Sequence, residues 1–326
     1  MTNLLQLPLV SFIVTSFNYE KFVLKTLESI KNQSYENIEI IVVDDKSSDN
    51  SVETIKNFIH KNKDLVIKLV EHCENKGQMA AMQTGLLYAN GKFVCFVDSD
   101  DILIKDYTKT LIRVHMASSV AFVSSQLVEI GEGDEIQTTY SLASFYKEKC
   151  FELKSLEDLL AVDVDNVDFK LLTLKDAPFG GWYWSAMSAN MFRKSALSPF
   201  LDLFMRYDTP ENWRVCPDKF LLNFAHLIGG SALVYAPLVG YRRHSANAGC
   251  SNQVCGCKSY VSDERTKLNI ANNKKLRNDT LSFIFRNRPS FDAQLGKRNV
   301  RGLIIQVLLS YFSVDLKKVF STLVSR

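Results

Sequence analysis

The chain has 326 residues, of which 46% are hydrophobic and 23% are charged, and its formal net charge is +3 at pH 7. This length is enough for one large domain or two lobes, and it excludes a small disulfide-stapled scaffold. The composition excludes a disordered chain and a membrane bundle, and the near-neutral charge gives no reason to expect a nucleic-acid partner.

The N-terminal segment predicts a protein that stays in the cytoplasm. Residues 1–8 lack the basic region, the apolar stretch and the small-residue cleavage site of a secretory signal. The seven cysteines point the same way, because their number is odd and Cys95 lies inside an apolar run. Reduced thiols fit this pattern better than a disulfide framework does.

The first 115 residues alternate apolar, β-rich runs with amphipathic patterns, which predicts βαβ units around a mostly parallel sheet. The predicted strands are Val10–Thr15, Ile38–Val43, Leu65–Glu71 and Lys92–Val97. Apolar residues at helical spacing predict helices around 23–30, 52–59 and 79–86. For the second helix, Asn50 followed by Glu53 predicts a capping box.

The pattern weakens between Ala117 and Asp176, where the polar stretch Gly131–Thr139 predicts a loop or a hairpin tip. A second patterned region follows at 180–247. Beyond Cys250 the chain turns polar and basic, and it becomes amphipathic again from Leu303 to Val324. The predicted divisions are therefore residues 1–116, 117–249 and 250–326.

Acidic residues directly follow two of the predicted strands. Asp44-Asp45 follows one strand, and Asp98-Ser99-Asp100-Asp101 follows another. In doubly wound sheets, ligands bind beyond the carboxyl ends of the strands. Adjacent carboxylates repel one another, so such clusters are best tolerated beside a divalent cation or hydrogen-bond donors. The alternative is that these residues only cap helices or form turns.

Several segments resemble, in unbroken order, the opening of family 2 glycosyltransferases. They are Val10–Tyr19, Ser29–Ser34, Glu39–Asp49, Asn75–Gln78, Ala89–Lys92 and Asp98–Asp101. The resemblance covers about residues 8–115 and continues more weakly to about 247. It implies a GT-A fold, with a Rossmann-like, mostly parallel sheet flanked by helices, an acceptor-side lobe and a C-terminal helical segment. The three divisions would then be the nucleotide-sugar-binding part, the acceptor-side part and a C-terminal extension.

The resemblance also implies an inverting transfer of a sugar from a UDP, GDP or dTDP sugar to a glycan or a lipid-linked acceptor. It assigns the donor to Thr15, Ser16, Phe17, Tyr19, Asp45, Asn75, Gly77, Gln78, Asp98 and Ser99. In this assignment Asp45 accepts a hydrogen bond from the base, and Asp98 approaches the ribose or the sugar.

A metal site is implied as well. Asp100 would bind Mn²⁺ or Mg²⁺ between the phosphates, because a hard cation prefers carboxylate oxygen. His244, in the Tyr-Arg-Arg-His run after a predicted strand, would complete the metal shell. Asp101 is either a further ligand or a supporting residue.

The acceptor side is assigned to the second half of the chain. Asp218 stands where the family carries its general base, and the alternative is a cap for a helix at 219–227. Trp182 and Trp184 would either face a sugar ring or pack in the core. Ala189 stands where glycine is common in the family, which argues against a tight backbone approach there.

Alternative interpretations remain for the enzyme and for its C-terminus. The chain would otherwise be a catalytically inactive nucleotide-sugar-binding module, or a metal-dependent nucleotidyltransferase, although no Gly-rich phosphate loop is present at 15–19. The segment from Leu303 would either lie on the inner face of the cytoplasmic membrane or pack on the enzyme or on a second copy in a homo-oligomer. Cys250, Cys255 and Cys257 lack the paired spacing of a structural zinc site.

Overall fold

The computed structural model describes residues 7–138, 153–198, 217–244 and 274–309, apart from 163, 165, 166, 275 and 276. Its strands are β1 (Val10–Ser16), β2 (Ile38–Asp44), β3 (Ile67–Glu71), β4 (Phe93–Asp98), β5 (Ile102–Leu103), β6 (Phe122–Ile130), β7 (Ile136–Thr138), β8 (Phe169–Leu172), β9 (Asn190–Arg193) and β10 (Ser231–Arg242). Its helices are α1 (Val23–Lys31), α2 (Ser51–Lys61), α3 (Gln78–Tyr88), α4 (Tyr107–Ala117), α5 (Leu156–Leu160), α8 (Asp218–Gly229) and α10 (Arg288–Leu295), with a 3₁₀ turn at Met187–Ala189. Residues 277–286 and 297–309 are helical as well.

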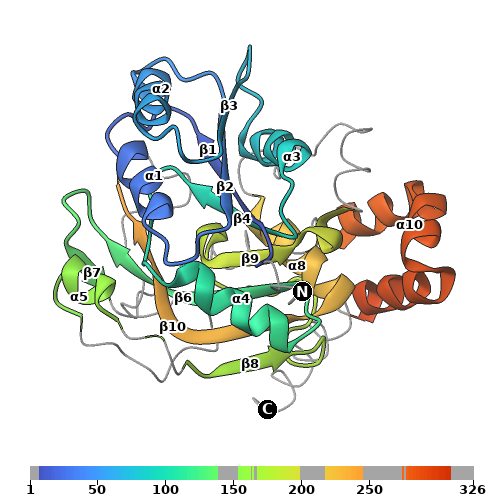
Figure 1. The fold of residues 1–326 in the computed structure, drawn as a ribbon. Coiled ribbons are helices and arrows are strands. Elements are labelled where there is room, and N and C mark those ends of the chain that lie inside the picture. The colour runs from blue at the N-terminus through green and yellow to red at the C-terminus, as the bar shows by residue number, and fades with distance from the viewer. Residues whose placement is uncertain are drawn as a thin grey trace, which may run out of the picture.

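The strands form a sheet of order β3-β2-β1-β4-β9-β6-β10-β5, with β7 on β6 and β8 on β10 (Figure 1). The pairs β1–β2, β1–β4 and β2–β3 are parallel, which confirms the four strands predicted for the first 115 residues. Strands β1 and β2 are buried along their whole length, which explains their nearly continuous apolar sequence.

Helices cover both faces of the sheet, and successive strand residues point to opposite faces. Phe12 and Val14 of β1 belong to a core shared with α1, α2 and α4. Ile13 of the same strand belongs to a second core, shared with α3, α8 and the C-terminal helices. In Figure 1, α1 and α2 accordingly lie on one side of β1 and α3 lies on the other. This architecture confirms the predicted fold class.

The second half of the sheet mixes strand directions. Strand β9 is antiparallel to both β4 and β6 and lies between them. Strand β10 is parallel to β6, and through Val239 and Gly240 it pairs with β5. The C-terminal end of β10 therefore lies beside the segment that follows β4, and this pairing positions the site described below.

The helix-capping prediction was wrong. Asn50 occupies the cap position of α2 but makes no side-chain cap bond, because its backbone is not in the extended conformation that a capping residue adopts. Its main-chain N–H donates to Glu20 Oε2 at 2.8 Å instead of reaching Glu53. The expected hairpin is present: Gly131 and Glu135 close the tip between β6 and β7.

Some predicted features lie wholly or partly outside the described residues. They are Cys250, Cys255 and Cys257, Thr139, and the part of Leu303–Val324 that follows residue 309. Among the helices that the structure describes, none is long and apolar enough to cross a bilayer.

Candidate active site

The acidic cluster forms a tight turn at the carboxyl end of β4. The Asp101 N–H donates to the Asp98 carbonyl at 3.2 Å, and the Ser99 hydroxyl donates to the Thr15 carbonyl at 2.7 Å. Gln78, the first residue of α3, donates to Asp98 Oδ1 at 2.6 Å. Asp100 and Asp101 are buried. The segments that contain Thr15, Gln78 and Asp98–Asp101, which were all assigned to one site, therefore meet here.

The carboxylates in this turn are close enough to disturb one another. Burial raises the pKa of Asp98 well above its ordinary value, and the charges of Asp218 and Asp100 raise it further. Burial followed by the charges of Asp100 and Asp98 does the same to the pKa of Asp101. Burial and then Asp100 also raise the pKa of the Tyr19 phenol. A cation at this turn would relieve the repulsion.

The residues of the turn suit Mn²⁺ or Mg²⁺. His244 Nε2 lies 2.9 Å from Asp100 Oδ2, and Tyr19 packs edge-on against the imidazole. Asp101 Oδ2 is buried and makes no hydrogen bond to any described residue. No group of three or more His, Cys, Asp and Glu side chains converges on one metal position in the described part of the chain. The chain thus offers a carboxylate and an imidazole, which is enough for a cation that takes its other ligands from phosphate and water.

A second network of hydrogen bonds surrounds Asp45, the residue after β2. His72 Nδ1 lies 2.7 Å from Asp45 Oδ1, and the N–H groups of Lys76 and Gly77 donate to the two carboxylate oxygens at 2.8 and 2.7 Å. Asn75 donates to the Asp45 carbonyl at 3.2 Å. A base N–H bound here would therefore share an acceptor that already serves three protein groups.

The residues assigned to the base and ribose differ in exposure. Thr15 and Ser16 are buried at the end of β1, whereas the Phe17 side chain is 43% exposed. His72 was missed, since a lone histidine after a strand carries no signal in the sequence; its Nε2 reaches Thr84 Oγ1 at 2.9 Å.

Asp218 lies near the acidic turn, and the same 3₁₀ turn contacts both of them. Its Oδ2 accepts the Met187 N–H at 3.1 Å, and the neighbouring Ser188 hydroxyl accepts the Asp98 N–H at 3.0 Å. Pro217 occupies the cap position of α8, so the interpretation of Asp218 as the helix cap was wrong. Burial raises the pKa of Asp218. The 3₁₀ turn at Met187–Ala189 thus holds two aspartates that lie far apart in the sequence.

The two tryptophans have different surroundings. Trp184 is buried, and its Nε1 donates to Ser231 Oγ at 2.8 Å, so it packs in the core. Trp182 is 37% exposed. The methyl group of Ala189 is buried in the core, where a glycine would leave a void. No local pattern in the sequence points to Asn223, which accepts the Gly180 N–H at 2.7 Å and fixes the loop before Trp182.

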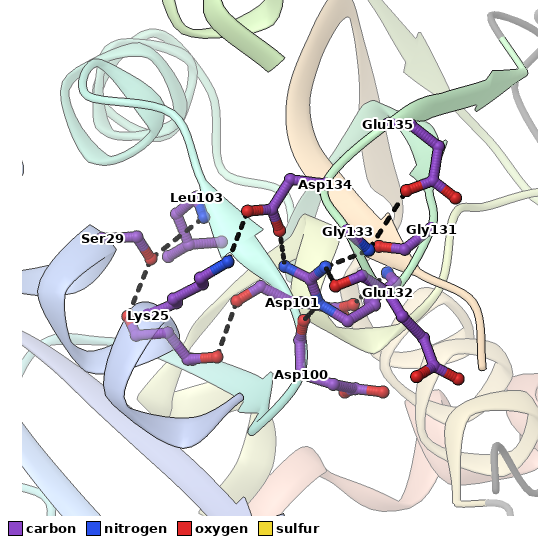
Figure 2. A network of polar contacts seen from close by, with 12 residues as sticks. Lys25, Ser29, Asp100, Asp101, Leu103, Gly131, Glu132, Gly133, Asp134 and Glu135 are labelled. Carbon is purple, nitrogen blue, oxygen red and sulfur yellow. Dashed lines mark hydrogen bonds and ion pairs between the residues drawn. The ribbon is translucent and has the colours of Figure 1, made fainter. Parts of the chain in front are cut away.

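The end of β10 contacts the acidic turn through two residues. Beside the His244 contact, Arg242 donates through Nε to the Asp100 carbonyl, and its main-chain N–H donates to Asp101 Oδ1, both at 2.9 Å. Figure 2 shows the residues on either side of this contact, Asp100 and Asp101 of the acidic turn and Gly131 and Asp134 of the β6–β7 hairpin. Arg242 belongs to the Tyr-Arg-Arg-His run, but the sequence alone assigns it no role.

Comparisons with known proteins relate part of the chain to one family. A family model described as "Glycosyl transferase family 2" matches residues 11–167. Glycosyltransferase GlyA of Streptococcus pneumoniae is 34% identical over 164 residues, which are 50% of this chain and 23% of GlyA. The Escherichia coli enzyme WfgD, a UDP-Glc:alpha-D-GlcNAc-diphosphoundecaprenol beta-1,3-glucosyltransferase, is 36% identical over 115 residues, 35% of this chain and 44% of WfgD. Each match spans less than half the length of the relative.

A solved structure is similar in fold. The crystal structure of S. aureus TarS residues 1–349 in complex with UDP-GlcNAc has a TM-score of 0.52 at 17% identity, over 93% of this chain and 80% of TarS. At this identity the likeness concerns the fold alone. It extends beyond the 11–167 match into the part of the chain that carries Asp218 and His244.

Proposed function

Because the chain belongs to family 2 of the glycosyltransferases, we propose that it transfers a sugar from a nucleotide-diphosphate sugar to a glycan or a lipid-linked acceptor, with inversion at the anomeric carbon. The observation that carries this proposal is that the Met187–Ala189 turn contacts both Asp98 of the acidic turn and Asp218. A donor bound there would have its diphosphate near the acidic turn and its sugar near Asp218. The lipid-linked acceptor is suggested by the name of WfgD.

In the proposed reaction, Asp218 takes the proton from the acceptor hydroxyl as this group attacks the anomeric carbon. Its raised pKa suits a general base, because a carboxylate of higher pKa binds the proton more strongly. Asp98, oriented by Gln78, would contact the ribose or the sugar.

Asp100 and His244 would hold the cation, which neutralises the charge that develops on the leaving diphosphate when it is bound. Tyr19 packs against the His244 ring and restricts its orientation. Asp45 would receive the base, and the surrounding donors from His72, Lys76 and Gly77 fix its carboxylate in one orientation.

The test has a binding arm and a chemical arm. Thermal unfolding is measured with UDP, GDP and dTDP, each with Mn²⁺ and with EDTA. One nucleotide at about 100 times its dissociation constant should add ~2.7 kcal/mol of stability, and only with the metal. Transfer from the matching sugar nucleotide should then be lost in Asp100→Ala and retained in Glu53→Gln, which changes an exposed carboxylate on α2.

The outcomes separate the alternatives. Full activity in EDTA or in Asp100→Ala would contradict the metal assignment. Metal-dependent nucleotide binding without turnover of any donor, tested with lipid-diphosphate acceptors, would identify an inactive binding module instead. Release of pyrophosphate from a nucleoside triphosphate and a sugar phosphate would identify a nucleotidyltransferase.

We also propose that the enzyme works at the inner face of the cytoplasmic membrane. The helix at 297–309 buries one face in the core through Val300, Leu303, Ile304 and Val307. Its opposite face exposes Arg298, Arg301, Ile305, Leu308 and Leu309. Basic and apolar side chains on one exposed face suit the surface of an anionic bilayer.

A further inference from the structure

Arg242 is a fully buried cation beside a cluster of carboxylates. Its side chain is 0% exposed and lies over the Phe22 ring, with 5.0 Å between the guanidinium carbon and the ring centroid. Burying a charge is costly unless it is paired and its hydrogen bonds are satisfied. The partners of Arg242 therefore indicate what it holds in place.

One set of partners belongs to the candidate metal site. Arg242 Nε donates to the carbonyl of Asp100, and the Arg242 main-chain N–H donates to the carboxylate of Asp101. The Asp101 N–H in turn donates to the Asp98 carbonyl. The peptide group between Asp100 and Asp101 is thus fixed through both its oxygen and its nitrogen, which sets the direction in which both side chains leave the turn.

The other partners belong to the β6–β7 hairpin, as Figure 2 shows. Nη1 donates to the Gly131 carbonyl at 2.6 Å, and Nη2 forms an ion pair with Asp134 at 2.5 Å. Asp134 also pairs with Lys25 of α1, whose side chain is 49% exposed. Although burial raises the pKa of Asp134, the hydrogen bonds from Lys25 and Arg242 bring it below its ordinary value, so this counter-ion stays charged.

The hairpin tip is built to present Asp134 to the guanidinium group. Asp134 has a φ of 70°, a left-handed conformation that non-glycine residues seldom adopt. Such a conformation persists only where surrounding contacts impose it, and two cations flank this carboxylate. Arg242 contacts Asp134 on one side and Asp100 and Asp101 on the other, so it connects the hairpin to the acidic turn.

We propose that Arg242 is a positioning residue for the cation-binding carboxylates, and that Asp134 on the β6–β7 hairpin sets the position of Arg242. This inference rests on the proposed function. The same short run that fixes the backbone of Asp100 through Arg242 brings His244 to its carboxylate. A displaced guanidinium group would therefore move the two metal-binding side chains relative to each other.

The experiment compares three variants of the full chain. Arg242→Lys keeps the charge but removes the Nε donor to Asp100. Asp134→Asn keeps the shape of the counter-ion and removes its charge at a residue outside the metal site. Arg288→Met is the matched control, because it also removes an ion pair, with Asp292, but on α10, which holds no residue of the site. Free Mn²⁺ is measured by electron paramagnetic resonance, with Mn²⁺ alone and with UDP, alongside thermal unfolding.

Arg242→Lys and Asp134→Asn should each weaken Mn²⁺ binding by ~10-fold or more, as is usual when a residue that orients a metal ligand is lost. Arg288→Met should stay within about twofold of wild type. If Arg242→Lys does not fold, Asp134→Asn decides. Wild-type Mn²⁺ affinity in Asp134→Asn, with only a lower unfolding temperature, would overturn the inference and leave Arg242 as a structural residue. No Mn²⁺ binding by the wild type in either arm would overturn it as well.

The result is distinguishable from failure of the proposed function. If the wild type transfers sugar but the variants bind Mn²⁺ normally, the positioning role alone is wrong. If the variants lose Mn²⁺ while the wild type transfers no sugar from any donor, the positioning role stands and the transferase proposal is wrong.

Discussion

The proposed general base, Asp218, is held in one orientation by a main-chain contact. The Met187 N–H holds one of its oxygens, which fixes the orientation of the carboxylate without neutralising it. We expect Asp218→Asn to keep nucleotide binding and Mn²⁺ dependence but to slow transfer by ~10²-fold or more, because the amide cannot accept the proton. Single-turnover kinetics would check this. A loss of donor affinity equal to the loss of rate would reassign Asp218 to donor binding.

The backbone of Lys46, next to Asp45, is in an unfavourable conformation. Its φ is 69°, in the left-handed region, where a side chain costs ~1–2 kcal/mol. Glycine removes that cost but gains chain entropy in the unfolded state, which offsets part of the effect. Lys46→Gly should therefore raise the free energy of unfolding by ~0.5 kcal/mol in urea titrations. Lys109→Gly, in the exposed face of α4, is the control and should lower it by ~1 kcal/mol. Equal losses in both variants would contradict the argument.

Helix α3 packs closely against the sheet at Gly85. A Cβ at Gly85 would lie 2.2 Å from Ile13 Cγ2 on β1, so Gly85→Ala should destabilise the fold by ~1–3 kcal/mol. Adding Ile13→Ala should cost less than the sum of the two single changes, because the smaller side chain makes room for the new methyl group. Additive losses in urea titrations would show that the contact does not limit packing. A Cβ at Gly302 would meet no atom of the described residues within 4 Å outside its own helix, so Gly302→Ala should stabilise that helix.

The sequence predicted the parallel elements well and the antiparallel ones poorly, for a physical reason. Strands β1, β2 and β4 are largely buried, so an apolar run marks each of them, and an aspartate at the end of β2 and of β4 marks the site. Strand β9 has only four residues, and its place between β4 and β6 depends on pairings far along the chain. Arg242 and His72 were missed as functional residues because a role set by partners from other elements leaves no local pattern.

Point substitutions on the exposed face of the helix at 297–309 test the proposed membrane contact better than deletion of the whole segment would. Deleting the segment would open the core, because Leu303 and Val307 pack inside it. We expect Arg298→Gln and Arg301→Gln each to weaken binding to anionic vesicles by ~1 kcal/mol at low salt. Ile305→Glu should abolish it, whereas Leu171→Glu, on β8, should not. Vesicle flotation would measure this, and wild-type flotation by Ile305→Glu would place this face elsewhere.

Across the whole molecule, buried histidines should make stability depend on pH. Burial lowers the pKa of His115 to about 3, although its Nε2 bonds the Met191 carbonyl, and burial lowers that of His226 to about 4. Both folded pKa values lie below the unfolded value of about 6.5. The unfolded chain therefore takes up protons first as the pH falls, and stability that is complete above pH 6.5 is lost progressively toward pH 4.

Removing one of these histidines isolates its contribution. Between pH 7.5 and pH 5, His115→Gln should lose ~2 kcal/mol less unfolding free energy than the wild type does. Urea titrations at both pH values would measure this difference. Parallel loss in the two proteins would show that His115 is protonated in the folded state.

The long reach of the β10 contacts also bears on the order in which the protein assembles during synthesis. The strands β1 to β4 come from the first 98 residues, so the parallel part of the sheet can pair while the ribosome is still making the rest. Asp100 and His244, in contrast, are separated by 144 residues, and Arg242 and Asp101 by 141. Closing loops of that length costs chain entropy before the contacts that offset this loss can form. A nascent chain can thus fold the parallel part of its sheet early, yet the proposed metal site stays incomplete until residue 244 has left the ribosome.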